Sequence, residues 1–154
     1  MSRQKGVTLI ELMIILGIIA ILATIAVPSF SSLVENSRLT TVSNDLAGLL
    51  TFSRSEAVKR GVQVDVVPLG GDLSNGLQSQ WTESSTTTAI RQMALSGGAV
   101  TLTNTGGNAQ FRNSGLLVNV AASKYRVCGG TGSKGSDITV TVGGQVRIQE
   151  VVCA

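Results

Sequence analysis

Histidine is absent from this chain of 154 residues, and only two cysteines occur in it. Without histidine there is no Ser-His or Cys-His pair to activate a nucleophile. The acidic residues are scattered, with no spacing that identifies a general acid and base. Two thiolates alone do not complete a tetrahedral zinc shell. We therefore expect no catalytic residue, no metal and no cofactor, and a protein that is not an enzyme.

Charged residues are also few, at 14%, and the formal net charge is +3. Two of the cations, Arg3 and Lys5, lie in the first few residues. The end of the chain is mildly basic, with Arg112, Lys124, Arg126, Lys134 and Arg147 against Asp137 and Glu150. We interpret this excess of cations as the solvated face of a soluble domain in preference to a site for an anionic partner.

One long apolar run dominates the N-terminus. It carries no charge from Leu12 to Val27, and as a helix counted from Val7 it is roughly 30 Å long, the thickness of a bilayer core. The basic stretch before it predicts a cytoplasmic N-terminus and an exported remainder. We expect a single-pass membrane protein, with a transmembrane helix over residues 7–30 and an exported domain over residues 31–154.

Glu11 interrupts the beginning of this run. A carboxylate in hydrocarbon costs on the order of 2.5 kcal/mol or more, so it indicates a function or a partner. Two other interpretations stay open. One is a signal peptide cleaved after small residues such as Ala20, Ala23 or Ala26. The other is a plain signal anchor in which Glu11 reaches the membrane interface.

The stretch KGVTLIELMIILGIIAILATIAVPSF resembles the N-terminus of type IV pilins and type II secretion pseudopilins. The resemblance implies a leader peptide over residues 1–6, cut after Gly6 by a prepilin peptidase, and methylation of the new N-terminus at Val7. Val7 replaces the phenylalanine usual in the family. Glu11 stands where the family's assembly glutamate meets the N-terminal amine of a neighbouring subunit, and Pro28 stands where the family has a proline. Because proline removes a backbone donor, we expect a helix kink near Gly17 or Pro28.

Helical periodicity continues after Pro28 and predicts one helix from about residue 7 to 60, with Gly61 as its C-terminal cap. Its apolar-to-small stripe consists of Leu39, Val42, Leu46, Leu49, Ser53 and Ala57. We expect Glu56 to form surface ion pairs with Lys59 or Arg60. The segment LLTFSRSEAVKRG at this helix end resembles the GspH/FimT branch of the pilin family.

Beyond Gly61 the composition favours short strands and turns. We predict an α+β fold like that of type IV pilins, with the helical spine on antiparallel sheet. The expected strands are 62–66, 77–82, 89–95, 99–103, 109–112, 116–120, 124–128, 138–142 and 145–151. Gly143 and Gly144 suit a two-residue hairpin turn. Loops are expected at 70–88 and at 129–136, where GGTGSKGS lacks the spacing of a phosphate-binding loop.

Cys128 and Cys153 both lie in the part predicted to be exported. An even count in an oxidising compartment favours a disulfide between them, near the C-terminus. Two free thiols are the alternative. The disulfide would close a loop of about 25 residues and contribute roughly 3.5 kcal/mol in the chain-entropy model.

The late stretch GGQVRIQEVVC resembles the closing hairpin of the family, in which some DNA-binding minor pilins carry Gly-Arg-x-Arg. Gly144 and Arg147 fit this pattern, but Gln145 replaces the first arginine. Lys124, Arg126, Lys134 and Arg147 are the candidate contacts to DNA phosphates, which would be bound without reading the base sequence.

The resemblance implies a minor pilin, a structural and assembly subunit of a type IV pilus that serves pilus biogenesis and twitching motility. Its expected partners are other minor and major pilins or pseudopilins, the prepilin peptidase and the inner membrane. A type II secretion pseudopilin is the first alternative. A DNA-binding receptor for natural transformation, with DNA as a further partner, is the second.

Overall fold

The computed structural model describes residues 8–83, 85–95, 100–129 and 134–153, apart from the side chains of 25–29 and 32. The chain divides into two compact units, residues 1–35 and residues 36–154, and each is described by itself. The predicted α+β fold is confirmed, with one long helix and two antiparallel sheets.

The helix α1 extends over Leu9–Arg60 and continues through Pro28. In the second unit its predicted stripe is buried, with Leu46, Leu49 and Ala57 almost fully covered. Gly61 ends the helix with a φ of 70°, a conformation that suits glycine because it has no Cβ. Its N–H donates to the Ala57 carbonyl at 3.0 Å, so the predicted cap is confirmed.

Within the described residues, eight strands form two sheets of four, and neighbouring strands are antiparallel. The first sheet has the order β3-β2-β1-β5, with β1 over Val64–Pro68, β2 over Gly76–Glu83, β3 over Thr86–Ala94 and β5 over Gln110–Phe111. Two short 3-10 helices, η1 (Leu69–Gly71) and η2 (Leu73–Asn75), connect β1 to β2. The second sheet has the order β4-β6-β7-β8, with β4 over Thr101–Thr105, β6 over Ser123–Cys128, β7 over Lys134–Val140 and β8 over Val146–Val152.

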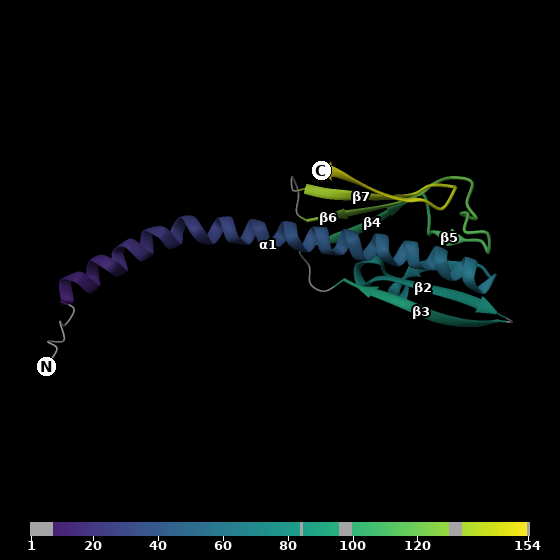
Figure 1. The fold of residues 1–154 in the computed structure, drawn as a ribbon, viewed down its shortest axis with the longest axis horizontal. Helices are drawn as coiled ribbons and strands as arrows, with labels where there is room; N and C mark the ends of the chain where they lie inside the picture. Colours follow the sequence, from purple (N-terminus) through teal and green to yellow (C-terminus); the bar gives the residue numbers. More distant parts are fainter. Residues whose placement is uncertain (1–7, 84, 96–99, 130–133, 154) are drawn as a thin grey trace, which may run out of the picture. The chain divides into compact units, whose positions relative to one another are not determined.

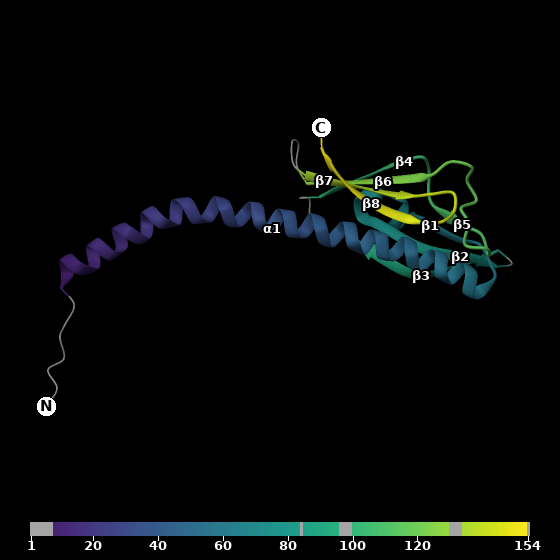
Figure 2. The same cartoon turned by 45° about the horizontal axis from the view of Figure 1, so that its top comes forward.

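Alternating strand residues build the core of the second unit. Val64 and Val66 of β1, Tyr125 and Val127 of β6, and Ile138 of β7 are fully buried, because successive side chains of a strand point to opposite faces. Within this unit α1 has β2 and β3 on one side and β6 and β7 on the other (Figures 1 and 2). The helix therefore contributes to the core shared by both sheets.

Several loop and turn predictions were wrong. Residues 116–120 do not form a strand: Leu117 makes a single bridge to Phe111, because the chain first turns between Arg112 and Gly115. The strand expected over 77–82 is present as β2, so the loop expected over 70–88 is interrupted by it. Strand β3 also begins earlier than predicted, at Thr86, because it pairs with β2 along its length. Lys134–Ser136, expected in a loop, begin β7, and residues 130–133 lie outside the described residues.

The hairpin between β7 and β8 also differs from its prediction. The Thr141 N–H donates to the Gln145 carbonyl and the Gly144 N–H donates to the Thr141 carbonyl, so three residues form the connection. Gly144 has a positive φ of 75° but Gly143 does not, whereas a two-residue hairpin turn needs a positive φ at its first central residue.

Candidate functional site

The predicted assembly residue Glu11 lies in the first turn of α1. The Thr8 Oγ1 accepts a hydrogen bond from the Glu11 N–H at 3.3 Å, and the Thr8 carbonyl accepts one from the Leu12 N–H. Threonine followed three residues later by glutamate is the pattern of a capping box, of which this bond forms one half. This half uses the Thr8 side chain and the Glu11 backbone, so Thr8 caps the helix. Sequence reasoning missed this cap, although the Thr-x-x-Glu pattern could have revealed it. Gly6 and Val7 lie outside the described residues.

The first unit exposes a continuous apolar helix surface. Every leucine, isoleucine and methionine side chain between Leu9 and Leu22 is exposed. Apolar surface of this extent marks a contact with another protein or with a membrane. Pro28 lies within α1, and the kink expected there stays a prediction.

Among the residues that the structure describes, no helix combines the length and the hydrophobicity needed to cross a membrane.

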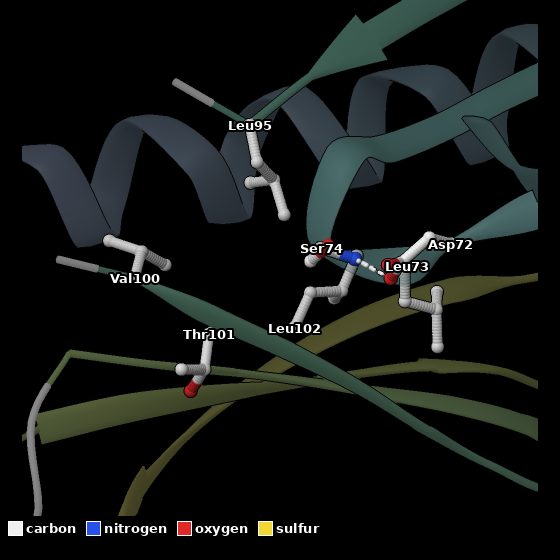
Figure 3. Close-up of a pocket in the computed structure, with 7 residues that line it drawn as sticks. All are labelled: Asp72, Leu73, Ser74, Leu95, Val100, Thr101 and Leu102. Atoms are coloured by element: carbon white, nitrogen blue, oxygen red, sulfur yellow. Dashed lines mark hydrogen bonds between the residues drawn. The ribbon is translucent and has the colours of Figure 1, made fainter. Parts of the chain in front are cut away.

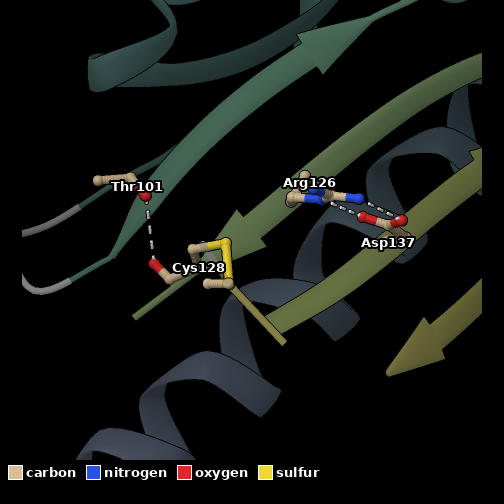
Figure 4. The surroundings of a disulfide bond; sticks show 5 residues. Thr101, Arg126, Cys128 and Asp137 are labelled. Atoms are coloured by element: carbon tan, nitrogen blue, oxygen red, sulfur yellow. Dashed lines mark hydrogen bonds and ion pairs between the residues drawn. A yellow bond between two sulfur atoms is a disulfide. The ribbon is translucent and has the colours of Figure 1, made fainter. Parts of the chain in front are cut away.

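The predicted disulfide is present. Cys128 at the end of β6 is bonded to Cys153, and their Cα atoms are 6.0 Å apart (Figure 4). The bond passes over Gly135 of β7, which pairs with Cys128 in the sheet. A Cβ atom at this position would collide with Cys153 Sγ and lie 3.2 Å from Cys128 Sγ. The absence of a side chain at Gly135 is therefore what lets the bond cross the strand between its two ends.

The predicted DNA contacts are only partly brought together. Lys124 and Arg126 of β6 share one acid, Asp137 of β7: Lys124 Nζ lies 2.6 Å from Asp137 Oδ2 and Arg126 Nε lies 2.7 Å from Oδ1 (Figure 4 shows Arg126). The hydrogen bond from Arg126 is the main cause that lowers the pKa of Asp137 to about 2. The sequence shows that Asp137 is present, but it does not show that β7 pairs with β6 and so brings Asp137 beside Lys124 and Arg126. Two candidate cations thus already share one acid within the protein.

Arg147 is the exposed cation of this sheet face. It pairs with Thr139 of β7, which in turn pairs with Lys124, so these three residues form one row across the strands. Lys134 is exposed at the beginning of β7 and also takes part in an interaction of its own. The row therefore combines Arg147 with a cation that Asp137 already engages.

The family-like helix end packs through its charged and aromatic residues. Glu56 is 8% exposed, so the ion pairs that we expected at the surface involve a buried carboxylate. Arg60 Nε lies 2.6 Å from Glu56 Oε2, and its hydrogen bond lowers the pKa of Glu56. The Arg60 guanidinium also stacks over Trp81 of β2, while Arg91 of β3 stacks over Phe52 of α1. Reciprocal cation–π contacts thus attach the helix to the first sheet.

One recess of about 400 Å³ lies between η2, the end of β3 and the beginning of β4 (Figure 3). Leucine and valine side chains form much of its wall, and the polar groups have partners: Asp72 accepts from the Ser74 N–H and Thr101 donates to the Cys128 carbonyl. It shows no nucleophile beside a base. Among the described residues there is also no group of three acids or cysteines that could hold a metal ion.

Comparison with known proteins identifies two family models that match this chain. The family model described as type II transport protein GspH matches residues 42–144, and the prokaryotic N-terminal methylation motif matches residues 1–27. Prepilin peptidase-dependent protein D of Escherichia coli K12 is 34% identical over 103 residues, which are 67% of this chain and 65% of that protein. The type IV major alpha-pilin of Moraxella bovis is 53% identical over 47 residues, 30% of each chain. In both alignments the chain spans less than two thirds of the relative's length.

The crystal structure of the type IV minor pilin FimU of Pseudomonas aeruginosa PAO1 has the same fold. It superimposes with a TM-score of 0.65 at 20% identity, over 75% of this chain and 90% of that chain. The long helix, the antiparallel sheets and the C-terminal disulfide define a type IV pilin-like protein. The chain belongs to the family described as type II transport protein GspH.

Proposed function

We propose that this chain is a minor pilin, a structural subunit without enzymatic activity that enters a type IV pilus together with other pilins. The observation that carries the proposal is the exposed apolar surface of α1 between Leu9 and Leu22, within residues 1–27 that match the N-terminal methylation motif. Such a surface needs a membrane before assembly and neighbouring helices after it. In this proposal residues 31–154 lie in the periplasm.

Processing is the first step. A prepilin peptidase cuts after Gly6, and the amine of Val7 is methylated. Intact-mass measurement of membrane-extracted protein tests this, with a methylated chain beginning at Val7 as the expected result. A chain that retains Met1, or one that begins near Ala26, would contradict the pilin proposal.

Glu11 is the proposed assembly residue. Cleavage creates a positive amine at Val7, and Glu11 of one subunit meets that amine of the next. Opposite charges attract strongly in a helix bundle of low dielectric constant, whereas an isolated buried carboxylate is driven towards its neutral form. The ion pair sets the register of neighbouring helices.

Two substitutions separate this role from the local role of Glu11 at the helix N-terminus. Glu11→Gln keeps a residue type that serves in a capping box but removes the charge, whereas Glu11→Ala removes both. We expect both variants to insert into the membrane and both to be depleted from sheared filaments. Recovery of Glu11→Gln at the wild-type level would sink the ion-pair role. Loss of Glu11→Ala alone would assign the defect to the start of the helix.

The first alternative is a pseudopilin of a type II secretion system, which the description of the matching family supports. A second is a DNA-binding receptor pilin, which the exposed cation Arg147 supports. A deletion scored for surface pili, twitching, secretion and transformation separates these three roles. The minor-pilin proposal predicts loss of pili and twitching with secretion intact.

A further inference from the structure

Three segments of the second unit meet around Arg54 near the C-terminal end of α1. The Arg54 Nε donates a hydrogen bond to the Gly115 carbonyl at 3.1 Å, across 61 residues of sequence. A Cβ atom at Gly115 would lie 3.0 Å from Val58 Cγ2, and one at Gly144 would lie 2.9 Å from Arg54 Nε. Both glycines are buried, so the turn at Gly115 and the β7–β8 hairpin fix the guanidinium between them.

Apolar side chains around this point face solvent. Val58 is 53% exposed, Leu116 47% and Val142 47%. They are close in space, since Val58 contacts Gly115, Leu116 follows it, and the Leu117 N–H donates to the Val142 carbonyl at 3.0 Å. We define the Arg54 surface as Arg54, Val58, Gly115, Leu116, Val142 and Gly144.

The charge on this surface has one sign. Glu56 forms ion pairs with Lys59 and Arg60, and Asp137 forms ion pairs with Lys124 and Arg126. Arg54 takes part in none of them, and its hydrogen bond to the Gly115 carbonyl uses Nε alone. The Nε edge of its guanidinium is held in place, and no acid among the described residues forms an ion pair with it.

An arginine held in this way is suited to a carboxylate. A guanidinium presents a rigid fork of donors that matches the two oxygens of a carboxylate. Because the Gly115 carbonyl already orients Arg54, less side-chain entropy is lost on binding than for a free arginine. Arginine surrounded by apolar contacts that exclude water is also typical of the residues that dominate binding energy in protein interfaces.

We propose that the Arg54 surface docks an aspartate or glutamate of a neighbouring pilin-like subunit, flanked there by aliphatic side chains. A free anion would leave Val58, Leu116 and Val142 in water, whereas a protein segment covers them and gains their burial. This inference rests on the proposed filament role and adds to it the chemistry of one contact between globular domains.

Site-specific photo-crosslinking in the producing cells tests the proposal with the full chain. A photoreactive amino acid replaces Ser114, an exposed residue on the same turn as Gly115, and its adducts are mapped by mass spectrometry. The expected adduct joins a pilin-like subunit next to one of its carboxylates. Arg54→Gln should reduce it about tenfold, since a hydrogen bond to a charged group contributes roughly 1.5–3 kcal/mol.

Matched variants control for the fold. Arg91→Gln removes a guanidinium from β3 that contacts Phe52 and lies outside the Arg54 surface, so it should leave the adduct unchanged. Leu116→Gln keeps the Arg54–Gly115 bond and should also weaken the adduct. Arg54→Glu combined with arginine at the mapped carboxylate should restore it, which a mere folding defect of Arg54→Gln would not allow.

The outcomes separate this inference from the proposed function. If the wild-type chain is recovered in filaments without a Ser114 adduct, or with an adduct that Arg54→Gln leaves intact, the docking proposal is overturned and the filament role stands. An adduct that depends on Arg54 but joins a second copy of this chain overturns the choice of partner. An adduct with another subunit, in a chain that never enters filaments, supports the surface and contradicts the proposed function.

Discussion

Arg126 donates two hydrogen bonds to Asp137 on the neighbouring strand, at 2.7 and 3.0 Å from its Nε and Nη2 atoms. Asp137 is only 4% exposed, whereas the Arg126 side chain is 42% exposed and the Lys124 side chain 41%. The acid is thus the buried member of the group, and the two cations remain partly in water.

Acid should weaken the fold through this carboxylate. Its ordinary pKa is near 3.8, and the hydrogen bond from Arg126 lowers the folded-state pKa to about 2. A lowered pKa means that the stabilisation is fully present above about pH 4 and is lost as the pH falls towards 2. We expect it to be on the order of 1–2 kcal/mol, because water screens the half-exposed cations. Denaturant unfolding of wild type and Asp137→Asn should converge in this window, and a constant difference would contradict it.

Tyr125 should resist ionisation. Its side chain is fully buried, and its hydroxyl accepts a hydrogen bond from the Ala109 N–H at 2.8 Å. Burial raises the pKa of Tyr125 to about 12, so stability is retained below about pH 10 and lost as the pH rises towards 12. It is the one tyrosine of the sequence, so the tyrosinate absorbance band reports it alone. Ionisation of the folded protein near pH 10 would contradict the burial.

Tyr125→Phe tests the hydrogen bond by itself. The variant fills the same space but leaves the buried Ala109 N–H without its acceptor. We expect a loss of about 1–3 kcal/mol in the free energy of unfolding. Trp81 fluorescence during denaturant unfolding measures it, and an unchanged midpoint would mean that another group takes the place of the hydroxyl.

Reduction should destabilise the second sheet. The Cys128–Cys153 bond spans a sequence separation of 25 residues and holds the end of β8 to β6. Its removal should cost roughly 3.5 kcal/mol in the chain-entropy model, seen as a lower Tm and faster amide exchange in β8. The double variant Cys128→Ser and Cys153→Ser is the control, because reductant should not change its Tm further.

The DNA hypothesis predicts an order of affinities. Asp137→Asn frees Lys124 and Arg126 and should strengthen binding of the full chain to double-stranded DNA, whereas Arg147→Gln should weaken it equally for every sequence. Binding should fall steeply with salt, since each neutralised phosphate releases counterion. A folded wild-type chain that binds no DNA at about 50 mM salt removes the receptor role.

Periodicity made the long elements of the fold predictable. Leu46, Leu49 and Ala57 recur at helical spacing because one face of α1 is buried, and Val64 and Val66 alternate because one face of β1 is. The same logic failed at residues 116–120, where apolar residues suggest a strand. Leu116 and Val120 are exposed there, and apolar content alone does not separate a strand from an irregular segment.

Some contacts in the candidate sites could likewise be predicted from the sequence, and others could not. The disulfide was predictable because the two cysteines lie in a part of the chain predicted to be exported, where they allow one intramolecular bond. The contact of Arg54 with Gly115 was not, because it joins distant segments through a turn that no spacing reveals. The pairing of Arg126 with Asp137 needs the register of β6 and β7, which alternation alone leaves undetermined.

Gly135, beneath the disulfide, constrains how this protein can change. A side chain there collides with Cys153 Sγ, and its Cβ would also lie 2.9 Å from the Val127 carbonyl oxygen. A homologue that gained alanine at 135 while both cysteines remain would have to distort the pairing of the strands. Loss of the cysteines would remove the collision with Cys153 Sγ but not the close approach to the Val127 carbonyl oxygen. We expect substitutions at Gly135, Cys128 and Cys153 to be inherited as a group among homologues, with glycine kept wherever both cysteines are kept.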